Sequence, residues 1–219
     1  MSGGEWKCKR CEGPLFAGVG NETRGPSRID ISVMEIRRAS EKDIPFIAKC
    51  ILSAASVASF EELNQEKHKQ KVELMEELCR SDWSLYYYEK SLIAYDGDLP
   101  VGAILSYDGG TYESARTLTF ERAHSIMGDT SNTEMETREG EYYLDSMTII
   151  PEYRGQGIGI KLMKGAMEEG RRQGFKKFSL LVDSQAPRLK EYYMKLGFEE
   201  ERPVAFLGHT YTRMLLQEN

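Results

Sequence analysis

The sequence predicts an α/β protein in which helices pack against a mixed β-sheet, and two observations support this fold class. Two short apolar segments flank Asp96-Gly97-Asp98, a typical hairpin turn, so strands early in the chain should pair antiparallel. Further along, apolar strand-like segments alternate with helical ones, which is typical of crossover connections between layers. Because hairpins come first and crossovers follow, an all-parallel sheet is excluded.

Hydrophobic periodicity assigns the elements one by one. An alternating strand pattern opens at Val33, and Ser40 with Asp43 three residues later resembles a capping box at the start of a helix. Gly197 after a helical stretch is a typical helix end. In chain order we expect strand 33–38, helix 40–58, helix 61–80, strands 91–95 and 101–107, helix 111–127, strand 142–150, helix 157–172, strand 175–182, helix 186–196, and strands 198–206 and 209–216.

The domain organisation follows from the same periodicity. Residues 1–33 are rich in Gly, Pro, Ser and Asn and lack a sustained pattern, which predicts a flexible N-terminal leader. Residues 34–219 carry all the expected elements and are long enough for one domain with a substantial core. We therefore predict a single domain over 34–219.

Composition narrows the class of protein. Apolar residues make up 40% and charged residues 29%, which is ordinary for a soluble globular chain. No apolar run reaches the roughly 18 residues needed to span a bilayer, and the N-terminus lacks the apolar core of a secretory signal. A net charge of −6 makes nucleic acid an unfavourable partner. We expect a cytoplasmic protein without membrane or nucleic-acid partners.

The cysteines raise the question of a metal site. Cys8 and Cys11 have the C-x-x-C spacing of one half of a zinc knuckle. Cys50 and Cys79 fall singly within expected helices, and the three histidines are scattered, so no partner pair completes the site. The sequence favours free thiols, and we expect no metal.

The loop between strand 142–150 and the following helix is built to hold an anion. It carries Arg154, Gly155, Gly157 and Gly159, and glycines let successive backbone N–H groups approach a phosphate at the positive end of a helix. A dinucleotide fingerprint fails, because its third glycine is absent in either register. A nucleotide P-loop also fails, because Lys161 lies between Ile160 and Leu162.

The remaining pattern, R-G-x-G-I-G after a strand, resembles the pyrophosphate loop of the GNAT superfamily of acyl-CoA-dependent N-acyltransferases. A second segment, KEYYMKLGF at 190–198, is similar to the L-Y-x-K-L-G-F motif of that family, with Tyr192 in place of the leucine. The resemblance covers roughly residues 34–217. It implies a mixed, mostly antiparallel sheet of about six to seven strands flanked by helices, in which two adjacent strands splay apart to admit the acyl-carrying arm.

The resemblance also implies a binding site for acetyl-CoA as acyl donor. The loop amides would hold the pyrophosphate, the edge of strand 142–150 would pair with the pantetheine arm, and a backbone N–H there, at Met147 or Ile149, would face the oxyanion. Ala186 stands where many members carry a cofactor-binding asparagine, which leaves Ser184 as a possible substitute. The expected cofactor-binding residues are Met147, Thr148, Ile149, Arg154, Gly155, Gln156, Gly157, Ile158, Gly159, Ile160, Ser184 and Tyr193.

Three side chains are candidates for the chemistry. Tyr193 occupies the tyrosine position of the second motif, and by resemblance it is the general acid that protonates the leaving thiolate. An alkylammonium titrates near 10, so a base or a water relay must remove its proton at neutral pH. Asp145, a polar residue in a largely apolar strand, is the first candidate for that base, and Glu141 is the second.

The expected function is therefore an N-acetyltransferase. It would transfer an acetyl group from acetyl-CoA to a primary amine of a small molecule or peptide, by direct attack in a ternary complex. Acidic residues of the stretch 129–145, with Arg138 as their one basic neighbour in that stretch, suggest a cationic amine if they line the mouth of the site. The alternative is a non-catalytic CoA-binding sensor or regulatory module of the same fold, as a monomer or homodimer in either case.

Overall fold

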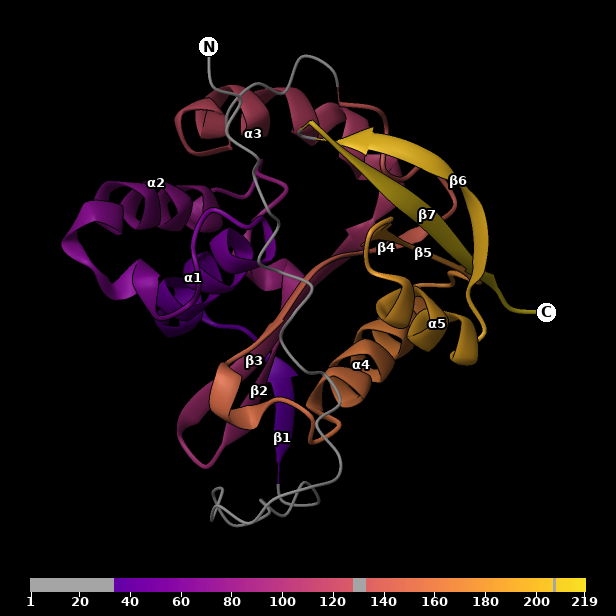
Figure 1. Cartoon of the computed structure of the whole chain (residues 1–219), viewed down its shortest axis with the longest axis horizontal. Helices are drawn as coiled ribbons and strands as arrows, with labels where there is room; N and C mark the ends of the chain where they lie inside the picture. Colours follow the sequence, from indigo (N-terminus) through magenta and orange to yellow (C-terminus); the bar gives the residue numbers. More distant parts are fainter. Residues whose placement is uncertain (1–33, 128–132, 207) are drawn as a thin grey trace.

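The computed structural model describes residues 34–127, 133–206 and 208–219, so the expected leader at 1–33 lies outside the described part. Seven strands form one sheet in the order β1-β2-β3-β4-β5-β7-β6 (Figure 1). Only β4 and β5 run parallel, and every other neighbouring pair is antiparallel, which confirms the predicted mixed, mostly antiparallel sheet. The strands are β1 Glu35–Arg38, β2 Ser91–Asp96, β3 Leu99–Asp108, β4 Tyr142–Ile149, β5 Lys177–Asp183, β6 Glu199–Phe206 and β7 His209–Gln217.

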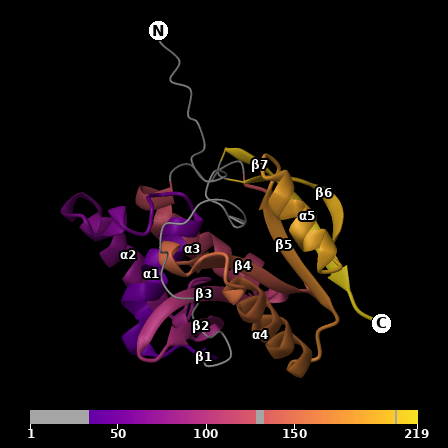
Figure 2. The ribbon, with the colours of Figure 1, turned by 60° about the horizontal axis from the view of Figure 1, so that its bottom comes forward.

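Helices cover both faces of the sheet (Figures 1 and 2). One face packs against α1 (Ile44–Ala54), α2 (Lys69–Arg80) and α3 (Tyr112–Met127), and together they enclose one apolar cluster. The opposite face packs against α4 (Ile158–Arg172) and α5 (Pro187–Lys195), which enclose a second cluster. The sheet therefore separates two apolar layers. No helix of the described residues is long and apolar enough to cross a membrane.

Local signals predicted most element boundaries, with three differences. The Ser40–Asp43 capping box is present, with the Ser40 amide 2.8 Å from the Asp43 carboxylate, but it begins a 3-10 turn, Glu41–Asp43, and α1 starts after that turn at Ile44. Helix α1 ends at Ala54 and not at residue 58, and Ser56 adopts a positive φ of 58°. The expected helix 61–80 is divided into two 3-10 turns, 62–64 and 66–68, followed by α2. Gln65 is extended and interrupts the helical path, which periodicity alone did not reveal.

The sheet opens between β4 and β5. These strands pair only at Tyr142 with Phe178 and at Tyr143 with Ser179, and beyond those positions they have no paired residues. On its other side β4 pairs with β3 along its length, but the register shifts so that Asp145 is left without an opposite residue. Such a bulge bends a strand and redirects a side chain. The bulge at Asp145 therefore lies just beyond the point where β4 and β5 separate.

Candidate active site

A cavity of about 870 Å³ passes through the sheet where β4 and β5 separate. Met163 of α4 and Leu189 and Tyr193 of α5 line it on one face of the sheet. Ile51 of α1 and Phe120 of α3 line it on the opposite face. The cavity therefore connects the two helical layers, and a molecule entering on the α5 side can meet a second molecule held on the α1 and α3 side.

The glycine loop forms the N-terminus of α4. Gly155 and Gly157 have positive φ values of 73° and 82°, a conformation that side chains other than glycine disfavour, and Gly157 is the N-cap residue. Within α4 the first hydrogen bond of the helical pattern runs from the Lys161 amide to the Gly157 carbonyl, over 3.2 Å. The amides of residues 158–160 come before this first bond, so no carbonyl of α4 accepts a hydrogen bond from them. They can therefore donate to a bound anion.

The rest of the loop is held by its own polar contacts. Arg154 is exposed, and its Nε donates a hydrogen bond of 3.0 Å to the Ile149 carbonyl. The Gln156 side chain donates to the Glu152 carbonyl over 3.3 Å. A Cβ atom added at Gly159 would lie 3.5 Å from Cε of Met147, a residue that lines the cavity. The first turn of α4 therefore adjoins the opening in the sheet.

The edge of β4 presents backbone groups to the gap. The Ile150 amide donates to the Val101 carbonyl on the β3 side over 3.0 Å. Backbone groups alternate in direction along a strand, so the amides of Met147 and Ile149 point away from β3 and toward the opening. Thr148 faces the helical layer instead, where its hydroxyl donates to the Cys50 carbonyl of α1 over 2.8 Å. Met147 and Ile149 therefore offer main-chain donors to the opening, whereas Thr148 joins β4 to α1.

Tyr193 lies at the cavity wall on α5. Its side chain is buried, and its ring packs edge-on against Phe198 with centroids 6.0 Å apart. Burial raises the pKa of the Tyr193 phenol well above its usual value, so the phenol keeps its proton through the physiological pH range. Tyr192 also lines the cavity, 5.5 Å from Tyr193 between ring centroids. Two tyrosine rings therefore flank this side of the opening.

Asp145 lies at the bulge of β4 and lines the cavity. Its carboxylate accepts hydrogen bonds from the Tyr107 hydroxyl at 2.7 Å and from the Ser146 hydroxyl at 2.8 Å. Burial raises the pKa of Asp145, while these two hydrogen bonds and the nearby charge of Lys90 act in the opposite direction. The structure thus brings Asp145 and Tyr193 to one cavity.

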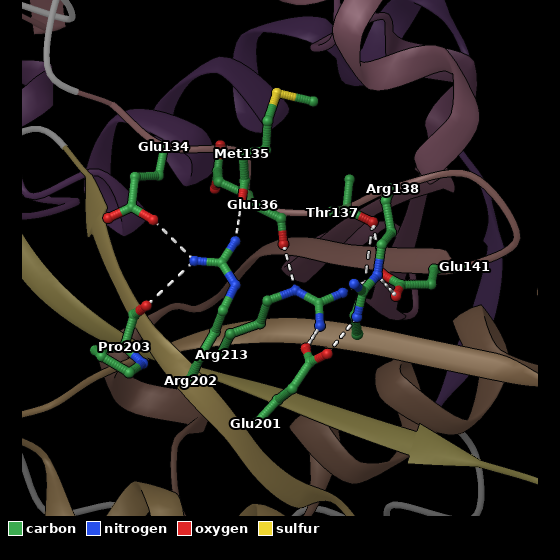
Figure 3. Close-up of polar contacts among 11 residues, drawn as sticks. Glu134, Met135, Glu136, Thr137, Arg138, Glu141, Glu201, Arg202, Pro203 and Arg213 are labelled. Atoms are coloured by element: carbon green, nitrogen blue, oxygen red, sulfur yellow. Dashed lines mark hydrogen bonds and ion pairs between the residues drawn. The ribbon is translucent and has the colours of Figure 1, made fainter.

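Glu141 and Ser184 do not line the cavity. The Glu141 carboxylate is buried in ion pairs with Arg138, at 2.9 Å, and Arg213 (Figure 3). Burial raises its pKa, but hydrogen bonds from both arginines outweigh that effect and hold the pKa below its usual value. This geometry favours a structural role for Glu141. Ser184 is exposed and shares a hydrogen bond of 3.1 Å with the Thr212 hydroxyl, while its neighbours Asp183 and Gln185 line the cavity.

Glu136 is a cavity residue that the sequence did not single out. It is 6% exposed, and its carboxylate accepts hydrogen bonds from the hydroxyl of Tyr112 and, at 2.7 Å, from that of Tyr143. Burial and the nearby charge of Asp145 raise the pKa of Glu136 to about 8. The available signal was its place in the acidic stretch 129–145, but nothing local distinguished it from its acidic neighbours.

Two arginines from distant strands hold the segment that carries Glu136 (Figure 3). Arg202 of β6 pairs with Glu134 at 2.8 Å and donates to the Met135 carbonyl at 3.0 Å. The fully buried Arg213 of β7 donates to the Glu136 carbonyl at 3.0 Å. Arg138 is the one basic residue within the stretch 129–145, as the sequence shows, and β6 and β7 supply further cations to this segment through tertiary contacts.

The cysteines fall into two groups. Cys8 and Cys11 lie outside the described residues. Cys50 and Cys79 are buried free thiols in α1 and α2, as the sequence placed them. Among residues 34–127, 133–206 and 208–219, no group of three or more His, Cys, Asp or Glu side chains is arranged to hold a metal ion.

The fold matches solved structures of acetyltransferases. A structure described as that of an acetyltransferase is 25% identical, with a TM-score of 0.67 over 84% of this chain and 100% of that chain. An N-acetyltransferase from Staphylococcus aureus Mu50 is 23% identical, with a TM-score of 0.64 over 83% of this chain and 100% of that chain. The PaiA N-acetyltransferase of Thermoplasma acidophilum, solved in complex with coenzyme A, is 19% identical, with a TM-score of 0.52 over 84% of this chain and 99% of that chain.

Residues 56–198 match the Acetyltransferase (GNAT) family. This stretch spans more than half of the chain, so the protein belongs to that family and to its class, the acetyltransferases. The resemblance inferred from the glycine loop and the KEYYMKLGF segment is thereby confirmed.

Proposed function

We propose that this protein transfers the acetyl group of acetyl-CoA to a primary amine of a small molecule or peptide, by direct attack within a ternary complex. One observation carries the proposal: a single cavity passes through the sheet opening, with Tyr193 on one face and Asp145 on the strand at the opening. Donor and acceptor can therefore enter from opposite faces and meet at β4, without a covalent enzyme intermediate.

The donor would lie along the loop and the β4 edge. The amides of residues 158–160 at the start of α4 suit a pyrophosphate. The positive φ at residue 157 favours glycine, and a glycine there leaves the concavity free of a side chain. The outward amides of Met147 and Ile149 suit an extended pantetheine arm, which pairs by strand addition. Two relatives of the same fold support this donor, since one was solved with coenzyme A and another, YncA of Salmonella typhimurium, with acetyl-CoA.

The chemistry needs two proton movements. The amine nitrogen forms a bond to the acetyl carbon, the carbon–sulfur bond breaks, and the thiolate leaves. Asp145 binds the incoming ammonium and takes its proton, directly or through water, and Tyr193 gives a proton to the sulfur. An amide of Met147 or Ile149 stabilises the oxyanion. Glu141, which is bound by two arginines away from the cavity, has no part in this scheme.

Thiol release in the presence of amines tests this function. Purified protein with acetyl-CoA and a panel of primary amines should release free thiol and form the acetylated amine. Asp145→Asn should lower kcat/KM by about 10² to 10⁴, as expected for a lost proton acceptor. Glu139→Gln is the matched control, because Glu139 is exposed and does not line the cavity. Binding of acetyl-CoA without thiol release with any amine would favour the non-catalytic sensor instead.

A further inference from the structure

The cavity contains two buried carboxyl groups at the ends of neighbouring tyrosine rings. Tyr107 and Tyr143 face each other across β3 and β4, with ring centroids 5.7 Å apart. The Tyr107 hydroxyl donates to Asp145, and the Tyr143 hydroxyl donates to Glu136. Since the two rings are adjacent, the carboxylates at their tips are close together, and the charge of Asp145 raises the pKa of Glu136. Both side chains line the same cavity.

Neither carboxylate forms an ion pair with a cationic side chain in the described part of the chain. Their hydrogen-bond donors are neutral hydroxyls, whereas Glu141 nearby is paired with two arginines. Arg116 of α3 weakly favours the Glu136 anion, but its N–H groups are bound to Thr133 and Met135. A buried carboxylate in a protein is normally paired with a cation, and an unpaired one tends to keep its proton. Glu136 and Asp145 face the cavity without a cationic side chain, so a cationic ligand there would stabilise their charged forms.

The position of Glu136 is fixed by the rest of the molecule. Arg202 and Arg213 bind the carbonyls of Met135 and Glu136, and the Glu134 amide donates to the Ala205 carbonyl over 2.9 Å. The tyrosine hydroxyls use one acceptor position on each oxygen of the Glu136 carboxylate, Tyr112 on Oε1 and Tyr143 on Oε2. Each oxygen therefore keeps a further lone pair for a donor within the cavity.

We propose that Glu136 is a specificity-determining residue that binds a second cationic group of the acceptor, so that the preferred acceptors are diamines. This inference rests on the proposed function and deepens it. Asp145, at the β4 bulge, holds the amine that is acetylated. Glu136, beyond the Tyr143 ring, holds the remote ammonium. Phe120, Tyr143 and Phe206 line this part of the cavity, and aromatic walls suit a cation and its methylene chain.

Protonation of Glu136 gives the proposal a measurable consequence. With a pKa of about 8, raised by burial and by Asp145, Glu136 is largely protonated in the free protein at neutral pH. A bound ammonium favours the carboxylate and lowers that pKa, so binding of a diamine releases a proton. The titratable and charged groups around Glu136 come from several elements. They are Tyr112 and Arg116 from α3, Tyr143 and Asp145 from β4, Tyr107 from β3, and Tyr86 before β2, and the tyrosines stay neutral in this range.

The kinetic test compares amines of equal chain length. Unaltered protein should acetylate a diamine of three to six carbons, such as 1,4-diaminobutane, about tenfold or more better in kcat/KM than the matching monoamine, such as butylamine, as a charged hydrogen bond predicts. Glu136→Gln should reduce this preference to about threefold or less. Glu139→Gln should keep the preference. Equal use of both amines by the unaltered protein, or a preference that survives Glu136→Gln, would overturn the proposal.

A binding measurement separates this inference from the proposed function. Titration of 1,4-diaminobutane by calorimetry at pH 7, in two buffers of different ionisation enthalpy, should show release of most of one proton per diamine bound. Butylamine should release little, and so should diamine bound to Glu136→Gln. If no amine is acetylated but this proton release is observed, the proposed activity fails and the diamine site stands. If amines are acetylated without it, the diamine site fails and the activity stands.

Discussion

Four carboxylates near β4 show how partners decide the role of a residue. Glu134 and Glu141 are bound by arginines of β6 and β7, which makes them part of the scaffold. Within the described residues, the side-chain donors to Glu136 and Asp145 are hydroxyls. Both groups line the cavity, and burial raises the pKa of both. The sequence shows five similar acids within twelve positions, these four and the exposed Glu139. Their different roles arise from residues that lie far away in the chain.

The raised pKa of Glu136 predicts a pH-dependent stability. Because the native state holds this proton more tightly than the unfolded chain, its contribution is fully present below the unfolded value of about 4.3 and is lost as the pH rises through about 8. Glu136→Gln removes the titration, so its melting temperature relative to the unaltered protein should rise between about pH 5 and about pH 9. Thermal melts across this range measure the difference. A constant difference, or one of opposite slope, would contradict the raised pKa.

Tyr193 gives the second prediction at this scale. Tyr193→Phe should lower kcat by about ten- to ten-thousand-fold through loss of the proton donor, with little change in the melting temperature, because the phenyl ring still packs on Phe198. Tyr192→Phe is the matched control, since Tyr192 lines the same wall. Steady-state thiol release measures both variants. A loss confined to Tyr192→Phe would assign the proton to the neighbouring ring, and unchanged kcat in both would remove the tyrosine from the mechanism.

Element boundaries were predictable where a local signal exists. The capping box at Ser40, the hairpin turn at Gly97 and the glycine loop before α4 all appear where the sequence placed them. The division of residues 61–80 was missed, because Ser59 and Glu62 cap a separate short turn within an otherwise helical pattern. Pairing between distant segments was also beyond the sequence, which is why Arg202, Arg213 and the cavity position of Glu136 were not predicted.

Packing of α4 on the sheet predicts the effect of two glycine substitutions. A Cβ atom at Gly170 would lie 2.7 Å from the Tyr142 ring and 2.8 Å from Phe178, both buried, so Gly170→Ala should destabilise the protein by about 1–3 kcal/mol through overpacking. Gly165 of the same helix has looser neighbours, 3.2 Å at Leu92 and 3.5 Å at Ile36. Gly165→Ala should therefore be close to neutral, because helix propensity offsets the contact. Chemical denaturation measures both, and equal effects would contradict this account of α4.

At the scale of the whole molecule, one sheet joins two apolar layers, and the cavity crosses it where β4 and β5 part. We propose that residues 34–219 form a single domain, as the sequence predicts. Both layers pack on the same strands, so neither can unfold without exposing the other. Scanning calorimetry should show one cooperative transition, with matching calorimetric and van't Hoff enthalpies. Two separate transitions would contradict the single domain.

The central claim is that the loop before α4 holds acetyl-CoA, and a calorimetric titration with acetyl-CoA tests it most directly. The unaltered protein should bind in the micromolar range, and Gly157→Glu should abolish binding, because it strains a backbone at φ 82° and places a negative side chain in the phosphate concavity. Gly174→Glu is the matched control, since Gly174 has a φ of 91° beyond the other end of α4 with open space around it. The account is supported if the unaltered protein and Gly174→Glu bind acetyl-CoA and Gly157→Glu does not. No binding by the unaltered protein, or equal binding by Gly157→Glu, would contradict it.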